Sequence, residues 1–267
     1  MLQKESKKTF NLIWKLSRND FKTRYAGSYL GALWAMVQPV VTVLMYYIVF
    51  DKIFKSRAEA VAGGIPIPYV LFLTAGLVPW FYFSEGLSNG TNALLQYNYL
   101  VKKVVFRIDI LPIIKMVAAS FIHVFFLCVL LIIAAIYGYY PNLYTFQLIY
   151  YSFCLFMLTL AISYATSAIV VFFRDLSQII QIALQIGMWA TPILWNINSI
   201  PQKWQIAIKV INPVSYIVLG YRSTICENKG FWVDWKYTLY FWCFTFVLLF
   251  VGKKIFAKLK VHFADVL

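Results

Sequence analysis

Charge is scarce in this 267-residue sequence, and acidic charge is the scarcer sign. Only 13% of the residues are charged, and ten of them are acidic, whereas an average soluble domain is about 25% charged. Apolar residues make up 62% of the chain, against about 45–50% in soluble domains. The composition excludes an ordinary soluble protein and predicts one membrane-embedded domain over residues 1–267.

Signals for covalent chemistry are also missing. The sequence has no G-x-x-x-x-G-K-[ST] motif for nucleotide phosphates, and its four cysteines show no metal-ligand or disulfide-framework spacing. The acids and histidines of the inner loops and apolar runs form no recognisable constellation; they are Glu85, Asp109, His123 and Asp175. We therefore predict no catalytic residue, no metal site and no cofactor in this chain. Residues 1–28 lack an apolar core followed by a cleavage site, so no removable signal peptide is expected.

Basic charge is what the chain does have. The formal net charge is +14, which in a soluble protein would suggest nucleic acid. Most of these basic residues flank apolar runs, where Lys and Arg report membrane topology and contact anionic lipid. Membrane lipids are therefore expected as partners, and nucleic acid is not.

The apolar runs predict six transmembrane helices, because about 20 apolar residues are needed to cross about 30 Å of hydrocarbon. The helices are expected at about 29–50, 69–92, 110–138, 145–173, 177–196 and 233–252. A seventh apolar stretch, 204–221, is interrupted by Lys209 and by the pair Asn212-Pro213.

The placement of Lys and Arg decides between six and seven spans. Short cytoplasmic loops carry an excess of these residues, and six spans put most of the 24 basic residues on one side, including the C-terminal "KKIFAKLK". We predict that both termini are cytoplasmic and that 200–230 forms short helices that dip into the outer leaflet. Such broken backbone is tolerated where it faces protein or a water-filled cavity.

The segment "TFNLIWKLSRNDFKTRY", at about 9–25, is too polar to span the membrane. Its aromatic and aliphatic residues recur at helical spacing, while Lys15, Arg18 and Lys22 fall on another face. This pattern predicts an amphipathic helix in the inner membrane interface. A simple anchor and a role in handling a lipid substrate both fit it.

Two polar features stand inside the apolar runs. Pro39 removes a backbone hydrogen bond and Gln38 is polar at about mid-depth, which favours a helix that faces protein or a cavity; a tolerated kink with Gln38 bonded to a neighbouring helix is the alternative. Glu85 is an intramembrane acid and so a functional candidate, unless it is solvated near the inner end of its helix.

Two further stretches have both functional and structural interpretations. The loop "QYNYLVKKVVFRIDILP" mixes apolar and basic residues, as a docking surface does, although its charge also fits simple positive-inside flanking. Trp189 and Trp195 end the fifth apolar run. They suit interfacial anchoring or a pore with aromatic walls, which would accept the C–H faces of sugars.

Five stretches, in this order and spacing, resemble the type-2 ABC transporter permeases that export bacterial polysaccharides. They are "RNDFKTRYAGSYLGALWAMVQP", "YLVKKVVFRIDILP", "FFRDLSQIIQIALQIGMWATPILW", "NPVSYIVLGYR" and "KLKVHFADVL". The resemblance covers nearly the whole chain and is closest to the O-antigen and wall teichoic acid exporters. It implies a multi-pass protein of the bacterial cytoplasmic membrane.

The resemblance also implies an assembly and a substrate. The permease would be a homodimer with a channel between its protomers, lined largely by the first and fifth spans. A separate ATPase dimer would carry ATP and Mg²⁺. The substrate would be a polysaccharide linked to undecaprenyl phosphate or pyrophosphate.

The same resemblance implies site residues. The channel would be lined by Trp34, Gln38, Pro39, Tyr46, Tyr47, Trp189 and Trp195. The anionic headgroup would meet Lys15, Arg18, Lys22 and Arg24 on the interface helix. A coupling segment at about 96–107 would dock on the ATPase through Tyr99, Lys102, Lys103, Val104, Phe106 and Arg107. Outer gate helices at about 200–227 would include Asn212, Pro213, Tyr216 and Arg222.

Three rival functions fit parts of the pattern. A drug or small-lipid exporter of the same architecture would have a narrow cavity without continuous aromatic lining. A membrane enzyme of glycan assembly would need a working acid/base or metal cluster. An ion channel or proton-coupled carrier would transport without ATP.

Overall fold

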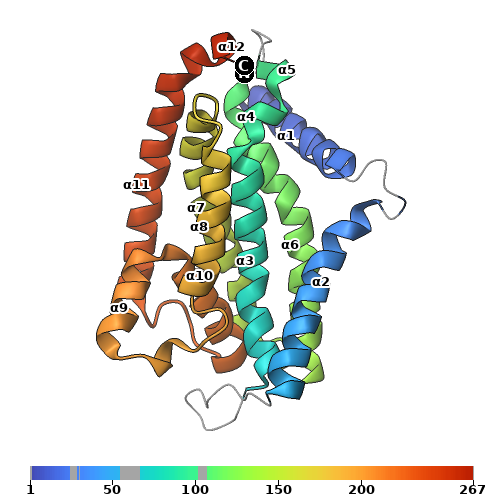
Figure 1. Ribbon diagram of the computed structural model, residues 1–267, viewed down its shortest axis with the longest axis vertical. Helices are drawn as coiled ribbons and strands as arrows, with labels where there is room; N and C mark the ends of the chain where they lie inside the picture. Colours follow the sequence, from blue (N-terminus) through green and yellow to red (C-terminus); the bar gives the residue numbers. More distant parts are fainter. Residues whose placement is uncertain (1, 25–28, 30, 55–66, 102–106, 267) are drawn as a thin grey trace.

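The computed structural model describes residues 2–24, 29, 31–54, 67–101 and 107–266, and every regular element in these ranges is helical (Figure 1). The expected all-α class is thus confirmed for the described residues. The α-helices are α1 Leu2–Arg24, α2 Trp34–Tyr46, α3 Tyr69–Thr91, α4 Ala93–Gln96, α5 Asn98–Val101, α6 Leu111–Ile136, α7 Gln147–Val170, α8 Leu176–Ala190, α9 Gln202–Ile211, α10 Pro213–Arg222, α11 Trp235–Leu259 and α12 Phe263–Val266.

Four of these helices are long and apolar enough to cross a membrane: α3, α6, α7 and α11. They run along the long axis of the molecule (Figure 1). They lie within the predicted ranges 69–92, 110–138, 145–173 and, with a longer C-terminal end, 233–252. α1 and α12 gather at one end of the bundle, which we call the inner end in keeping with the predicted topology (Figure 1).

α2 and α8 are apolar but shorter than the other spans. α2 contains Pro39 and changes into wider π-helical turns over Tyr47–Ile53. α8 has 15 residues and ends just before Thr191-Pro192, because proline cannot continue the hydrogen-bond ladder. A helix of that length rises about 22 Å, less than the hydrocarbon thickness of about 30 Å. The count of six spans therefore stays a prediction, with these two as its short members.

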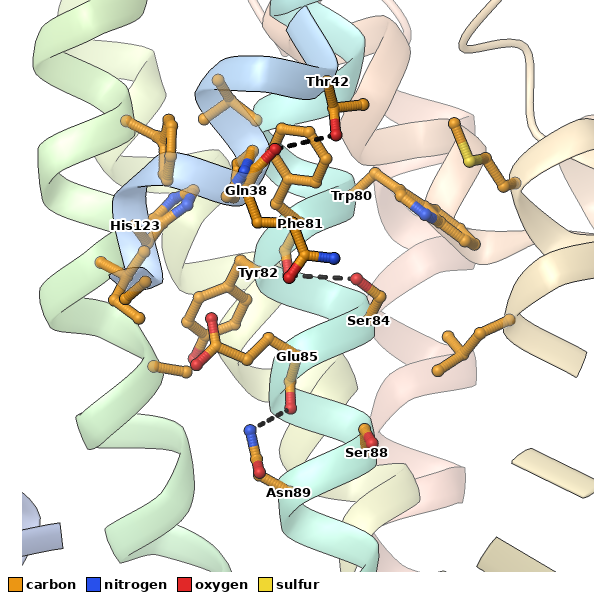
Figure 2. Close-up of a pocket in the computed structure, with 18 of the residues that line it drawn as sticks. Gln38, Thr42, Trp80, Phe81, Tyr82, Ser84, Glu85, Ser88, Asn89 and His123 are labelled. Carbon is orange, nitrogen blue, oxygen red and sulfur yellow. Dashed lines mark hydrogen bonds between the residues drawn. The ribbon is translucent and has the colours of Figure 1, made fainter. Parts of the chain in front are cut away.

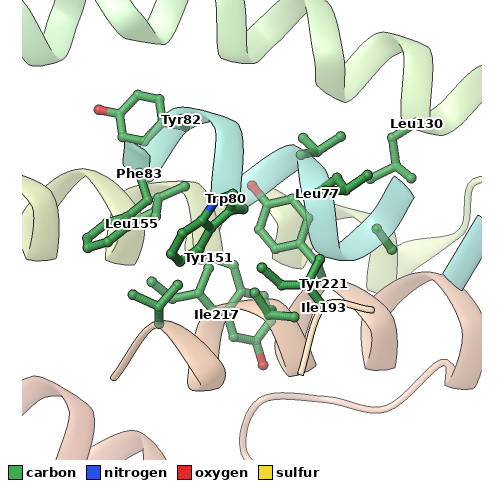
Figure 3. Close-up of a cluster of buried hydrophobic side chains, with 14 of the residues drawn as sticks. Leu77, Trp80, Tyr82, Phe83, Leu130, Tyr151, Leu155, Ile193, Ile217 and Tyr221 are labelled. Atoms are coloured by element: carbon green, nitrogen blue, oxygen red, sulfur yellow. The ribbon is translucent and has the colours of Figure 1, made fainter. Parts of the chain in front are cut away.

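The core lies between α3, α6, α7 and α10, where large side chains interdigitate (Figure 3). Leu77 of α3, Tyr221 of α10 and Leu155 of α7 are fully buried there. Lipid is as apolar as these side chains, so close packing at small residues has to hold the helices together. Gly220 supplies such a position, because an added Cβ would lie 2.1 Å from the ring of Tyr151.

α1 packs against the inner half of α6. Its aromatic residues Trp14 and Phe21 meet the ring of Phe121 edge-on, with centroids 5.3 and 5.9 Å away. The buried Ser17 hydroxyl donates to the carbonyl of Ile114 at 3.1 Å. The helix predicted at about 9–25 is present in α1 as far as Arg24, with residue 25 outside the described residues, and one of its faces packs against the bundle.

The stretch predicted at about 200–227 forms two short helices and a π-helical end, Ser223–Glu227. The backbone breaks at Asn212, whose side chain accepts from the amide of Val214 and so begins α10. Pro213 occupies the first turn of α10, where a missing N–H costs nothing. This region lies at the end of the bundle opposite α1 (Figure 1).

Candidate functional site

A cavity of about 950 Å³ lies between α2, α3, α6 and α8. Three of the predicted channel residues line it, namely Trp34, Gln38 and Pro39 of α2. Phe81 of α3 and Met188 of α8 line it as well. Gln38 and the polar residues of α3 lie along the same space (Figure 2).

The other predicted channel residues do not line this cavity. Tyr46 packs beside Phe50, with ring centroids 6.0 Å apart, and Tyr47 begins the π-helical turns. The Trp195 indole donates to the carbonyl of Trp189 at 3.0 Å, at the outer end of α8. Trp189 is 66% exposed, so its ring is available to a surface outside this protomer.

A polar face of α3 also lines the cavity. Its residues are Ser84, Glu85, Ser88 and Asn89 (Figure 2). Only Glu85 was singled out from the sequence, although the spacing of three and four residues places all of them on one helix face. The sequence alone could therefore have predicted a polar face on this apolar helix.

Glu85 belongs to a cluster of charges that connects the inner end of the cavity to α1. The Arg24 guanidinium donates to the Glu85 carboxylate and, at 3.2 Å, to Asp20. Asp20 also accepts from the Lys115 ammonium of α6 and, at 2.6 Å, from the Tyr97 hydroxyl. The cluster thus joins α1, α3 and α6 to the short segment between α4 and α5.

The cluster is buried where it meets α6. The side chains of Asp20 and Lys115 are 7% and 3% exposed, and the Lys115 ammonium lies 4.7 Å from the centre of the Tyr97 ring. Burial alone raises the pKa of Asp20, but Lys115, Tyr97 and Arg24 outweigh burial and hold that pKa below its ordinary value. Burial, with the nearby Asp20 carboxylate, raises the pKa of Tyr97, so its hydroxyl stays protonated and donates.

The four basic residues predicted to meet a headgroup are not equivalent. Lys15, Arg18 and Lys22 are exposed on the face of α1 turned away from the bundle. Arg24 alone among the four lines the cavity. Sequence periodicity identified the charged face, but it gave no sign that the last residue of the helix turns into the bundle.

Of the predicted coupling residues, the structure describes Tyr99 and Arg107. Tyr99 is exposed, and Arg107 is exposed and paired with Asp109 at 3.1 Å. Lys102, Lys103, Val104 and Phe106 lie outside the described residues.

Arg222, predicted as an outer gate residue, is a buried clamp. Its guanidinium donates to the carbonyls of Phe72, Pro192 and Ile193, the last at 2.5 Å, and lies 3.4 Å from the Phe72 ring centre. These contacts join α10 to α3 and to the turn that ends α8. The Tyr216 hydroxyl bonds Tyr150 and Thr238 at 3.0 and 2.9 Å, which ties α10 to α7 and α11.

We expect Arg222→Lys to destabilise the protein by about 1–3 kcal/mol per carbonyl left unpaired. A lysine keeps the charge, but it cannot present donors to three carbonyls in one plane. Unfolding in mixed detergent micelles measures the loss, and Lys203→Arg is the matched control because Lys203 is exposed on α9. A variant as stable as wild type would contradict the clamp.

His123 of α6 contacts residues of three other helices. Its Nε2 lies 3.1 Å from the Ser152 hydroxyl and 3.0 Å from the Tyr221 hydroxyl, and the ring packs on Tyr82. Within the described ranges, no group of three His, Cys, Asp or Glu could hold a metal ion.

The sequence is similar to one protein-family model and to several proteins of known name. A family model described as "ABC-2 type transporter" matches residues 11–226. The chain is 28% identical over 263 residues to an O-antigen export system permease protein of Klebsiella pneumoniae, covering 97% of this chain and 95% of the relative. It is 27% identical to the O-antigen export system permease protein of Myxococcus xanthus, covering 95% and 94%. It is 24% identical to a polysialic acid transport protein of Escherichia coli, covering 87% of each chain.

Proposed function

This chain belongs to the ABC-2 type transporter family, and from that premise we propose that it is the membrane permease of an ABC transporter that exports a polysaccharide. The observation that carries the proposal is the likeness, over 97% of this chain, to a protein named as an O-antigen export permease. The likeness to a polysialic acid transport protein supports the same class of substrate.

We further propose the carrier and the assembly. The glycan would be linked to undecaprenyl phosphate or pyrophosphate and cross the bacterial cytoplasmic membrane with both permease termini on the inner side. Two copies of the chain would enclose the channel, because α2 and α8 carry exposed apolar faces such as Leu44 and Ile182 beside the cavity. Closed two-fold symmetry then puts equivalent walls on both sides of the path.

The residues of this chain would bind and guide, while a separate ATPase dimer supplies ATP hydrolysis. Arg24 would meet the anionic headgroup at the inner end of the cavity, since guanidinium groups pair with phosphate oxygens in a bidentate way. ATP binding would close the ATPase dimer and move the coupling segment at 96–107. Through Tyr97 and Asp20, 2.6 Å apart, that movement would reach α1, and α10 would open the outer end. Such a shift between two packed arrangements is how a local change opens a gate.

We expect this chain to co-purify in detergent with the ATPase encoded beside it. Two permeases and two ATPases should form one complex, and charge reversal at Lys102 and Lys103 should dissociate it, because docking would rest on these side chains. Gel filtration with light scattering measures the composition. ATPase assays with and without lipid-linked glycan measure the coupling.

Charge reversal at Lys254 and Lys258, exposed on α11, is the matched control and should leave the complex intact. A chain that purifies alone, in a strain that still exports glycan without the ATPase, would overturn the proposal and favour a membrane enzyme of glycan assembly.

A further inference from the structure

α3 and α8 carry polar side chains at matching intervals on the faces that meet. The first set is Ser84 and Ser88 on α3 with Asn92 at the C-terminal cap of that helix, and the second is Ser177, Gln181 and Gln185 on α8. Residues four apart share a helix face, and each step of four rises about 6 Å. Apolar helices in lipid have no need of such a series, so its occurrence on both partners calls for a role.

Each residue of one set faces a residue of the other, and we call each such pair a level. At two of the three levels, a hydrogen bond joins the two side chains. Ser177 donates to the Asn92 side chain at 2.7 Å, and the Gln181 amide donates to the Ser88 hydroxyl. These bonds hold the inner end of α8 to α3, as polar side chains commonly do between membrane helices.

The third level is open. Ser84 donates to the carbonyl of Phe81 at 3.2 Å, which leaves its oxygen free to accept. Within the described part of the chain, the side-chain amides of Gln185 and of Gln38 make no hydrogen bond, and both side chains are exposed. All three residues line the 950 Å³ cavity, and Figure 2 shows Gln38 of α2 and Ser84 of α3 around the same space.

We propose that Gln38, Ser84 and Gln185 form a binding site for the hydroxyl groups of a glycan; the proposal rests on the function proposed above. Each amide offers two donors and one acceptor oxygen, and a sugar hydroxyl is both donor and acceptor. The rings of Trp34 and Trp80 line the same cavity and suit the C–H faces of a sugar ring. α3 thereby joins α2 and α8 as a third wall of the path.

The chemistry of the three residues separates this ligand from other occupants. They are uncharged, so they give little affinity for an ion, and the nearby Glu85 is already paired with Arg24. An acyl chain would leave both amides without partners in an apolar medium, which costs free energy. A hydroxyl-rich chain satisfies the amides without fixing one orientation, as a substrate that must keep moving requires.

The test uses the full complex of permease and ATPase with two lipids, the glycan-bearing carrier and the same undecaprenyl pyrophosphate without sugar. Gln38→Met and Gln185→Met keep the side-chain size and remove the amide. We expect each to raise the concentration of glycan-bearing lipid for half-maximal ATPase stimulation at least tenfold, and the sugar-free lipid to act as on wild type. Gln178→Met is the matched control, because Gln178 is exposed on α8 but does not line the cavity.

Equal shifts for both lipids, or no shift, would overturn the glycan site. Loss of the permease dimer in the two variants would also overturn it, because the amides would then contact a second copy of the chain. If wild type responds to neither lipid, the proposed function itself fails. If wild type responds to both lipids and the variants respond as wild type does, the proposed function is retained but the glycan site is not.

Discussion

Replacing Lys115 with methionine should destabilise the protein by about 3–5 kcal/mol, the usual cost of removing one partner of a buried ion pair. The variant leaves the Asp20 carboxylate, 7% exposed, without its closest cation. The remaining partners, the Arg24 guanidinium at Oδ2 and the Tyr97 hydroxyl at Oδ1, each donate one hydrogen bond to the carboxylate and do not replace the buried charge of Lys115. Unfolding in mixed detergent micelles measures the loss.

The matched control removes both charges. The double variant Asp20→Asn with Lys115→Met removes both members of the buried pair and leaves Arg24 paired with Glu85; replacing a whole buried pair by neutral groups of similar size is often close to neutral. We therefore expect the double variant to recover most of the stability that each single variant loses. Additive losses would mean that the two residues act independently and that the pair does not hold α1 to α6.

The pH dependence gives a second, qualitative signature. In wild type the pKa of Asp20 is below its ordinary value of 3.8, so its stabilising contribution is present above about pH 4 and is lost as the pH falls further. In Lys115→Met, burial dominates and raises that pKa. The single variant should therefore gain stability as the pH is lowered toward 4, whereas wild type should not. The same direction for both proteins would contradict the pairing.

The helices of this fold were predictable where the length or the periodicity of one segment is sufficient to identify them. The apolar lengths of α3, α6, α7 and α11 exceed what a membrane crossing needs, and the period of α1 separates its aromatic from its basic face. The end of α8 is marked in the sequence by Pro192. The π-helical turns over Tyr47–Ile53 have no comparable mark in the sequence.

The site was harder to predict because its contacts join residues far apart in the chain. Asp20 and Lys115 are 95 positions apart, and the sequence around either residue does not indicate that the other is its partner. Gln181 and Ser88 are each visible as polar residues in apolar runs, but their pairing needs the register of α8 against α3. Arg222 was assigned to the outer gate from the resemblance alone, whereas two of its three carbonyl partners, Pro192 and Ile193, lie in the turn that follows α8.

We expect the rate of glycan export to depend on the positive charge of Arg24 and not on the ion pair that Arg24 forms with Glu85. Arg24→Gln removes the one basic residue among the described side chains of α1 that lines the cavity, and we expect glycan export to fall at least tenfold, since a charge-assisted hydrogen bond contributes about 1.5–3 kcal/mol. Glu85→Gln keeps the guanidinium and removes the carboxylate that competes for it. Export by this variant should stay at or above the wild-type level. Cell-surface glycan, normalised to permease in the membrane, measures both.

The double variant Arg24→Gln with Glu85→Gln separates a binding role from a structural one. It has no unpaired charge at this position, so its stability should return close to wild type, but its export should stay as low as that of Arg24→Gln. Arg18→Gln is the control for interface charge, because Arg18 is exposed on the same helix and should cost little. If the double variant exports normally, the pair only holds α1 to α3, and the anionic headgroup is met elsewhere on the chain.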